Sequence, residues 1–298
     1  MKLFKPTISL SGGIGNQLFQ WAAAHVLFRG TVFNLNLRHY QLNTERGFQL
    51  DVIQESCSHS VCHGNKLGRM PFPKIFEWAA AKGVPANLLE PLGFFQESSF
   101  SPNFRRRIQW KTKLGTPLYV GGLFQDSALV DEAWPLIENE LTYSLTQAFE
   151  NVKARLDFPT KYAAVHVRRG DYPISTRPSH AIGQLDDEFF IRNTSGFDLP
   201  IILLTENANE VIDLSRTLKA KFVISNIEAN PFETLSILKN SEFSLGSNSS
   251  LSWWGAYLAA KSGKLSKLPE GWSQWENYET PKLKNPSIEF SPSSWTRI

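Results

Sequence analysis

Cysteine and methionine are scarce in this chain of 298 residues, which has two of each. With only Cys57 and Cys62, a disulfide framework is excluded, and a reducing, cytoplasmic setting is indicated. Together with His59 and His63, the two cysteines could be drawn as a metal cluster, but their spacing matches no common zinc pattern. We therefore expect no metal site.

Long apolar runs are also missing, since no stretch approaches the ~20 apolar residues of a membrane span. At the N-terminus, Lys2 and Lys5 are soon followed by a polar turn, which is not the pattern of a signal peptide. The net charge of +3 is too small to indicate nucleic acid as a partner. It suits a small anionic substrate or an anionic membrane surface.

The pattern of apolar segments predicts an α/β protein with two domains, 1–156 and 157–298. The chain opens with a strand over 7–10, a glycine-rich turn, a helix over 16–29 and a strand over 31–37, which is a βαβ unit. The region 40–115 is less regular, with room for a short helix at 73–81. A helix in two pieces is expected over 128–156, and a tail without regular structure after 281.

In the second half, strands are expected at 161–167, 200–206, 221–225, 242–247 and 264–269, with helices between them. Apolar strands separated by helices indicate a parallel sheet covered on both faces.

The segment AVHVRRGDY (164–172) is the strongest candidate for a binding site. An apolar strand ends there in His166, Arg168, Arg169 and Asp171. Guanidinium is always charged, and its donors match phosphate oxygens two at a time. Because ligands of open α/β sheets bind outside the carboxyl ends of the strands, we expect a pocket for an anion such as a diphosphate. The alternative is an Arg–Asp pair that only closes a turn.

Two further loops have the strand–turn–helix form that binds anions. In the first loop, GGIGNQ (12–17), Gly13 and Gly15 allow a ligand to approach the backbone closely, and the start of the helix offers free amides. The alternative is a tight turn with Asn16 as the N-cap of the helix. The second loop is polar, with hydroxyls and amides that favour phosphate; its alternative is a serine N-cap. It runs through Ser247, Asn248, Ser249 and Ser250 to Trp253 and Trp254. For the two tryptophans we expect a place in the core.

Taken in order and spacing, SGGIGNQLFQ, HVRRGDY and SNSSLSWWGAYL resemble the bacterial α1,2-fucosyltransferase family. The first two motifs are also similar to the α1,6- and protein O-fucosyltransferases, and GGLFQD (121–126) is a weaker match. Trp21 stands where that family usually has tyrosine, and Leu251 where it has phenylalanine. Both changes are conservative, so they concern packing and not chemistry.

The resemblance implies two Rossmann-like domains facing a cleft, the GT-B type. The N-terminal domain would lie on the acceptor side, and the C-terminal domain would bind the GDP-sugar. It implies an inverting galactoside 2-α-L-fucosyltransferase of surface glycan synthesis, with GDP-fucose as donor and no metal or other cofactor. The acceptor would be a galactose-containing oligosaccharide, which can be lipid-linked.

The resemblance also implies roles for single residues. Arg168 would grip the diphosphate, where charge develops on the leaving GDP, and His166 would lie beside the nucleoside. Asn16 would lie near the fucose and the acceptor, Asp171 would orient an arginine, and Glu233 would read guanine. The alternative for Glu233 is an exposed helix glutamate. The general base stays unassigned. The catalytic candidates are Arg168, Asn16 and Asp171, and the substrate-binding candidates are His166, Arg169, Gly13, Gly15, Gln17, Glu233, Asn248, Ser249 and Ser250.

Other interpretations stay open. The chain could transfer another GDP-linked sugar, such as colitose, or form another linkage. It could also be a catalytically silent nucleotide- or glycan-binding protein. The basic stretch 105–113 could contact an anionic membrane peripherally, although a solvated basic face is the interpretation that we favour.

Overall fold

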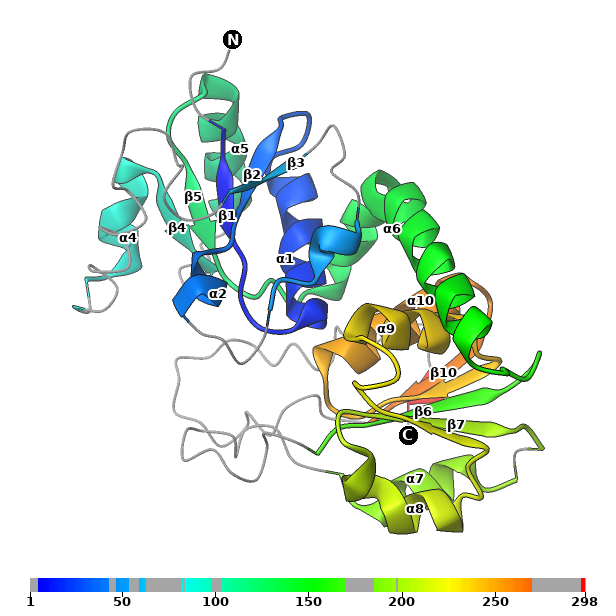
Figure 1. The fold of residues 1–298 in the computed structure, drawn as a ribbon. Coiled ribbons are helices and arrows are strands. Elements are labelled where there is room, and N and C mark those ends of the chain that lie inside the picture. The colour runs from blue at the N-terminus through cyan, green and yellow to red at the C-terminus, as the bar shows by residue number, and fades with distance from the viewer. Residues whose placement is uncertain are drawn as a thin grey trace. The chain divides into compact units, whose positions relative to one another are not determined.

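The structure is a computed structural model that describes residues 5–42, 47–53, 59–62, 82, 84–97, 103–169, 185–196, 198–269 and 296–297. The chain divides into two compact units, Met1–Leu141 and Thr142–Ile298 (Figure 1). The division falls within the long helix α6 (Ser127–Arg155), whereas the boundary expected after residue 156 lies just beyond the end of that helix.

Unit 1 contains a five-stranded parallel sheet in the order β3-β2-β1-β5-β4. Its strands are β1 (Thr7–Ser9), β2 (Phe33–Asn36), β3 (His59–Cys62), β4 (Phe94–Gln96) and β5 (Tyr119–Gly121). Its other elements are α1 (Ile14–Leu27), α2 (Arg38–Leu42), η1 (Leu50–Val52), α4 (Ala86–Leu89), η2 (Glu90–Leu92) and α5 (Phe104–Leu114). Ile8 of the central strand lies opposite Leu35 on one side and Val120 on the other. The glycine-rich turn therefore leaves the sheet at its centre.

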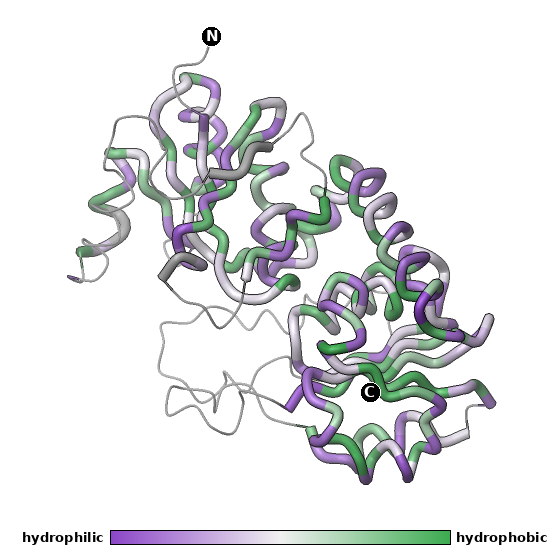
Figure 2. The backbone as a smooth tube through the Cα atoms, viewed as in Figure 1, coloured by the Kyte–Doolittle hydropathy of each residue, from purple (hydrophilic) through white to green (hydrophobic). Residues whose placement is uncertain are grey.

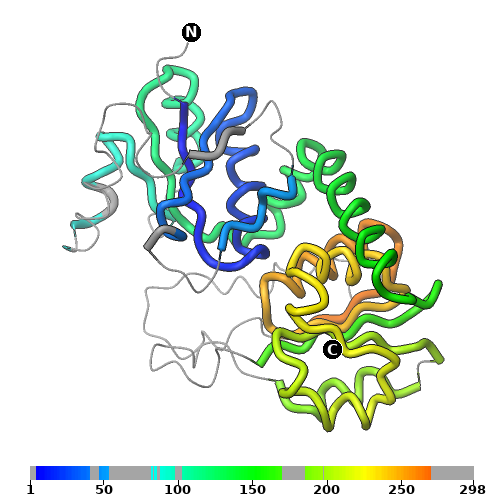
Figure 3. Tube along the Cα trace, in the orientation of Figure 1, coloured from blue at the N-terminus to red at the C-terminus, as the bar shows by residue number. Residues whose placement is uncertain are grey.

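Unit 2 contains a six-stranded parallel sheet in the order β11-β10-β9-β6-β7-β8. Its strands are β6 (Ala163–Val167), β7 (Ile201–Thr205), β8 (Phe222–Ile224), β9 (Phe243–Leu245), β10 (Leu265–Leu268) and β11 (Thr296–Arg297). Its helices, besides the end of α6, are α7 (Asp187–Thr194), η5 (Ala208–Val211), α8 (Ile212–Thr217), α9 (Pro231–Asn240) and α10 (Ser250–Lys261). Counted from β6, this is the strand order 3-2-1-4-5-6 of dinucleotide-binding domains. The chain can be followed from α6 into this sheet in Figure 3.

Helices cover both faces of the unit 2 sheet, as the uninterrupted apolar strands predict. One face of β6, which carries Val165, packs with α7 and α8 through Phe190 and Leu214. The other face, which carries Ala164, packs with α9 through Ile237. Figure 1 shows α7 and α8 on one side of the sheet and α9 and α10 on the other, and Figure 2 shows hydrophobic residues along its strands. His166 therefore points to the face that α9 and α10 cover.

The predicted α/β class is confirmed, and each strand expected in the second half is present. The helix expected in two pieces is wrong, because α6 is continuous through Pro135. Its buried residues recur at helical spacing on both sides of the proline (Val130, Ala133, Ile137 and Leu141), so packing outweighs the lost hydrogen bond. The short helix predicted at 73–81 lies outside the described residues, as does most of the tail after 281. The tail was expected to lack regular structure, but Thr296–Arg297 form β11, which pairs with β10.

Candidate functional site

The HVRR and SNSS segments meet at the topological switch point of the unit 2 sheet. From β6 the chain proceeds to β7 on one side, whereas β9 pairs with β6 on the other. Val165 is in register with Leu245, the last residue of β9, and β6 continues from there to Val167. In doubly wound sheets, ligands bind at such a point, outside the carboxyl ends of the strands.

The hydroxyl of Ser247 ties the two strand ends together. It donates to the carbonyl oxygen of His166 at 2.7 Å and accepts the backbone N–H of Arg168 at 2.9 Å. Because Ser247 is buried, these bonds work in a low dielectric. The segment after β6, which begins with Arg168 and Arg169 (the arginine loop), is thereby fixed to the polar segment after β9 that contains Ser247.

His166 is buried and serves this same junction. Its Nδ1 lies 2.7 Å from the hydroxyl of Ser252, which already accepts from the Ser247 N–H at 3.0 Å and from the Ser249 hydroxyl at 3.1 Å. One hydrogen bond joins Nδ1 and this hydroxyl, and the tautomer of the ring decides which of the two donates. Burial, together with the charge of Arg168, lowers the pKa of His166 to about 3, so the ring is neutral. The predicted position beside a nucleoside stays a prediction.

Ser249 is the N-cap of α10, where its hydroxyl accepts the N–H of Ser252 at 3.0 Å. The serine-cap interpretation is thus confirmed, and so is the core position of Trp253 and Trp254, both of which are fully buried. Ser250 opens the helix, and Asn248 is buried just before it. A cap of this kind leaves backbone amides of the first turn for an anion.

Arg168 forms an ion pair with a carboxylate that the sequence motifs did not indicate. Its Nη1 lies 2.9 Å from Oε1 of Glu206, the residue directly after β7. The Arg168 side chain is 11% exposed and that of Glu206 is 30% exposed. Glu206 follows β7 directly, and β7 lies beside β6 in the sheet. Its position could therefore have been recognised from the sequence only if this strand order had been known.

Arg169 turns away to a different set of partners. It forms an ion pair with Asp187 in the first turn of α7, and its Nη1 donates to the carbonyl of Glu210 at 3.3 Å. These contacts hold η5 and α7 against the arginine loop. Asp171, the other member of the predicted set, lies outside the described residues.

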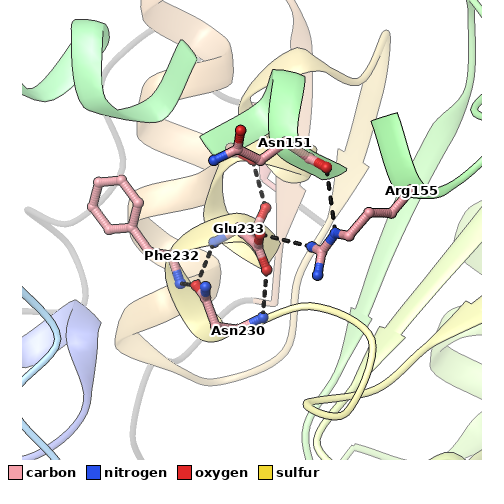
Figure 4. A network of polar contacts seen from close by, with 6 residues as sticks. Asn151, Arg155, Asn230, Phe232 and Glu233 are labelled. Carbon is pink, nitrogen blue, oxygen red and sulfur yellow. Dashed lines mark hydrogen bonds and ion pairs between the residues drawn. The ribbon is translucent and has the colours of Figure 1, made fainter. Parts of the chain in front are cut away.

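Glu233 caps the N-terminus of α9 (Figure 4) and is buried, so the alternative of an exposed helix glutamate is wrong. Its Oε2 accepts the N–H of Asn230, whose side chain accepts the Glu233 N–H in return, both at 2.9 Å. This is a capping box. Its Oε1 lies 2.7 Å from Nη2 of Arg155 in the last turn of α6. A guanine-reading role, which stays a prediction, would have to share these oxygens.

In unit 1 the glycine-rich turn also leaves the sheet at a switch point, between β1 and β5. Helix α1 begins at Ile14 with Gly13 as its N-cap, so the interpretation of Asn16 as the N-cap is wrong. Gly15 belongs to the first turn of the helix. Gly12 has a φ of +75°, and a Cβ there would lie 2.5 Å from Nδ2 of Asn16.

The side chain of Asn16 is held from the loop after β5. Its Oδ1 accepts from Nε2 of Gln125 at 2.9 Å. The fully buried Gln17 binds backbone instead, donating to the carbonyls of Gly12 and Gly47 and accepting the N–H of Gln49. Asn16 is therefore positioned from the GGLFQD segment, while Gln17 holds the turn itself.

The loop after β5 is braced by Glu97, a carboxylate that no sequence motif indicated. Its Oε2 accepts the N–H groups of Leu123 at 2.6 Å and Phe124 at 2.8 Å. Phe124 has a φ of +53°, a left-handed backbone that is uncommon for this residue. Burial raises the pKa of Glu97 above its ordinary value, although the two backbone donors oppose the shift.

Within the part of the chain that the structure describes, no three histidine, cysteine or acidic side chains gather as metal ligands. Two members of the Cys/His cluster, Cys57 and His63, lie outside that part. Likewise, no helix among the described residues is long and apolar enough to cross a membrane.

No protein-family model matches the chain. Two curated proteins of Escherichia coli are similar along nearly its whole length. An α-1,2-colitosyltransferase is 25% identical over 97% of this chain and 97% of its own. The O-antigen biosynthesis glycosyltransferase WbnK is 25% identical over 90% of this chain and 95% of its own. Both relatives are glycosyltransferases, and the likeness supports glycosyltransferase activity for this protein.

Two solved structures resemble the fold more distantly. POFUT1 in complex with GDP matches with a TM-score of 0.46 and 12% identity over 89% of this chain and 98% of its own. The E. coli heptosyltransferase WaaC with ADP matches with a TM-score of 0.44 and 13% identity over 96% of this chain and 90% of its own. Similarity at this level does not bear on the function of the chain.

Proposed function

We propose that this protein transfers L-fucose from GDP-fucose to the 2-hydroxyl of a galactoside, with inversion and without a metal, in the synthesis of a surface glycan such as an O-antigen. One observation carries the proposal. A mostly buried arginine and the cap of a twelve-residue helix lie at the switch point of a sheet with dinucleotide-binding strand order. The two relatives support the class of reaction.

Arg168 stabilises the leaving group in this proposal. As the bond to the anomeric carbon breaks, negative charge grows on the β-phosphate of GDP. A guanidinium in a partly dehydrated crevice, with the amides at the start of α10, offsets that charge more strongly than water does. Ser247 and His166 act through the backbone, because they fix where Arg168 begins.

Unit 1 supplies the acceptor side in this proposal. Asn16, held by Gln125, offers an amide for sugar hydroxyls. Gly13 and Gly15 leave the backbone at the start of α1 open to close approach.

GDP-colitose is the second candidate donor, and the likeness to the α-1,2-colitosyltransferase favours it. Colitose is L-fucose without its 3-hydroxyl, so the two donors differ in one polar group. A site that hydrogen-bonds this hydroxyl rejects colitose by about 10⁴-fold, whereas a site that packs against the ring discriminates weakly. The ratio of kcat/KM for the two donors therefore distinguishes them.

The test is a donor and acceptor screen read by mass spectrometry. Purified protein is incubated with GDP-fucose, GDP-colitose or GDP-mannose and with galactosides, with and without EDTA, and the linkage is determined by NMR. Transfer of fucose to the 2-hydroxyl is expected, with no effect of EDTA. Arg168→Ala should lower kcat by about 10²–10³, whereas Arg192→Ala, an exposed arginine of α7, should not. GDP binding without any transfer would overturn the proposal in favour of a silent binding protein.

Glu233 needs a separate experiment, because its structural bonds and its proposed guanine contact predict different losses. Glu233→Gln keeps an oxygen for the cap and weakens the Arg155 ion pair. If Glu233 reads guanine, the variant also loses its preference for GDP over ADP in calorimetric titrations. If it only caps α9, the melting temperature falls and the nucleotide preference is unchanged.

A further inference from the structure

Helix α5 presents an exposed stripe that is both basic and apolar. Arg106, Trp110, Lys113 and Leu114 are all exposed, with Trp110 at 61% and Leu114 at 55%. Their positions follow the i, i+4, i+7, i+8 spacing of one helix face. We call these four residues the α5 stripe. The opposite face is buried through Phe104, Ile108 and Thr112, so the helix is fixed with the stripe outward.

The other cations of α5 are used within unit 1, and those of the stripe are not. Arg105 binds Glu132, Arg107 binds Glu90, and Nζ of Lys111 donates to the carbonyl of Pro91 at 3.2 Å. By contrast, Arg106 and Lys113 have no ion-pair partner among the residues that the structure describes. Two positive charges therefore face solvent beside a tryptophan and a leucine.

The neighbouring segment adds more apolar surface. The contacts of Arg107 and Lys111 bind α5 to η2, and Leu92 at the end of η2 is 60% exposed. Leu88, one turn earlier in α4, is 63% exposed. Leu88 and Leu92 therefore add exposed apolar side chains to the segment that Arg107 and Lys111 join to α5, and gathered exposed apolar side chains mark interaction surfaces.

We propose that the α5 stripe binds peripherally to an anionic lipid surface. Arginine and lysine attract acidic headgroups, and tryptophan prefers the boundary between headgroups and acyl chains. The alternative of a solvated basic face accounts for the two cations but not for the exposed apolar side chains of Trp110 and Leu114. An acidic protein could pair with the two cations, but the mixed cationic and apolar stripe matches both layers of a lipid interface. The inference is independent of the proposed donor, because it concerns binding without substrates.

The experiment is sedimentation with vesicles in the absence of nucleotide. Wild-type protein is expected to sediment with vesicles of phosphatidylglycerol and phosphatidylcholine, but not with phosphatidylcholine alone, and salt should release it. Each cation near an anionic surface contributes about fivefold to partitioning. The double variant Arg106→Gln, Lys113→Gln should therefore bind at least about tenfold more weakly. Trp110→Ser should also weaken binding, by a similar factor at every salt concentration at which the wild type still sediments with the vesicles.

Matched controls lie in unit 2. Arg192→Gln with Lys219→Gln removes two exposed charges, and Ile227→Ser removes a side chain that is 92% exposed. These variants should bind like wild type. Because all substituted side chains are exposed, circular dichroism should show an unchanged fold. Equal binding of the stripe and control variants would overturn the proposal, and so would absence of wild-type binding to anionic vesicles.

Discussion

Glu206 provides the carboxylate partner of Arg168, with Oε1 and Nη1 2.9 Å apart at the carboxyl ends of neighbouring strands. The pair offsets the charge of a guanidinium that is only 11% exposed. A diphosphate bound at the switch point would offer Arg168 negatively charged oxygens, as the Glu206 carboxylate does when no ligand is bound. The carboxylate and the proposed ligand therefore act on one cation.

Glu206→Ala should make the protein less stable and more responsive to GDP. Loss of this carboxylate removes one favourable charge from beside a mostly buried cation, at a cost of about 1–2 kcal/mol, since Glu206 is partly exposed. GDP should then raise the melting temperature of the variant more than that of wild type, because the diphosphate replaces the missing charge. For Glu206→Gln, which keeps an oxygen, the rise in melting temperature with GDP should lie between those of wild type and Glu206→Ala. An equal GDP shift in all three proteins would show that the diphosphate does not reach Arg168.

His166 should make stability depend on pH in acid. Its pKa is lowered to about 3 in the folded protein from 6.5, so between these values the unfolded chain binds the extra proton. The stabilisation is fully present above pH 6.5 and is lost as pH falls, by about 1.4 kcal/mol per pH unit. His166→Asn keeps a side-chain amide that can donate to or accept from the Ser252 hydroxyl, and it cannot titrate.

The measurement is urea unfolding of both proteins from pH 7 down to pH 4.5. The difference in unfolding free energy between wild type and His166→Asn should change steadily over this range, in favour of the variant at low pH. Carboxylates contribute to both curves and cancel in the difference. A constant difference would mean that His166 is not held neutral.

The strand-and-helix alternation of unit 2 was predictable because its strands β6, β7 and β8 are mostly apolar and are separated by polar turns and helices. Unit 1 was harder, since β4 is three residues long and α5 begins with three arginines after its first residue, so neither has a clear hydrophobic period. Arg168 could be identified from the sequence because adjacent arginines at a strand end need a partner. Glu206 and Glu97 could not, because their roles depend on which strands become neighbours and on the backbone of a distant loop.

Gly12→Ala and Gly30→Ala should separate backbone strain from displacement of Asn16. Both glycines are left-handed, with φ of +75° and +70°, so alanine costs each about 1 kcal/mol or somewhat more. Only at Gly12 does the new Cβ meet Asn16, whereas nothing lies within 4 Å at Gly30. The Asn16 side chain can rotate away, but it then loses Gln125. We therefore expect similar losses of stability in urea, with transferase activity reduced only by Gly12→Ala. Equal transferase activities of Gly12→Ala and Gly30→Ala would contradict a role of Asn16 in acceptor binding.

Glu97 should be needed for the shape of the loop after β5 and not for its charge. Glu97→Ala leaves the N–H groups of Leu123 and Phe124 without their acceptor, so the left-handed Phe124 relaxes and Gln125 moves off Asn16. Activity should fall by about tenfold or more, mainly through the acceptor KM. Glu97→Gln keeps a neutral oxygen for both donors and should retain most of the activity.

The comparison of these two variants also addresses the missing general base. Burial raises the pKa of Glu97, so a base role would give an acidic limb in the pH profile of kcat above the usual range for glutamate. Under the bracing role that limb is absent, and Glu97→Gln has the wild-type profile. Glu228→Ala serves as the control, because Glu228 also accepts a backbone N–H, that of Ser225 in unit 2. It lies far along the chain from the loop after β5. If Glu97→Gln were as inactive as Glu97→Ala, with unchanged GDP binding, the charge itself would be required, and Glu97 would become the carboxylate that takes the acceptor proton.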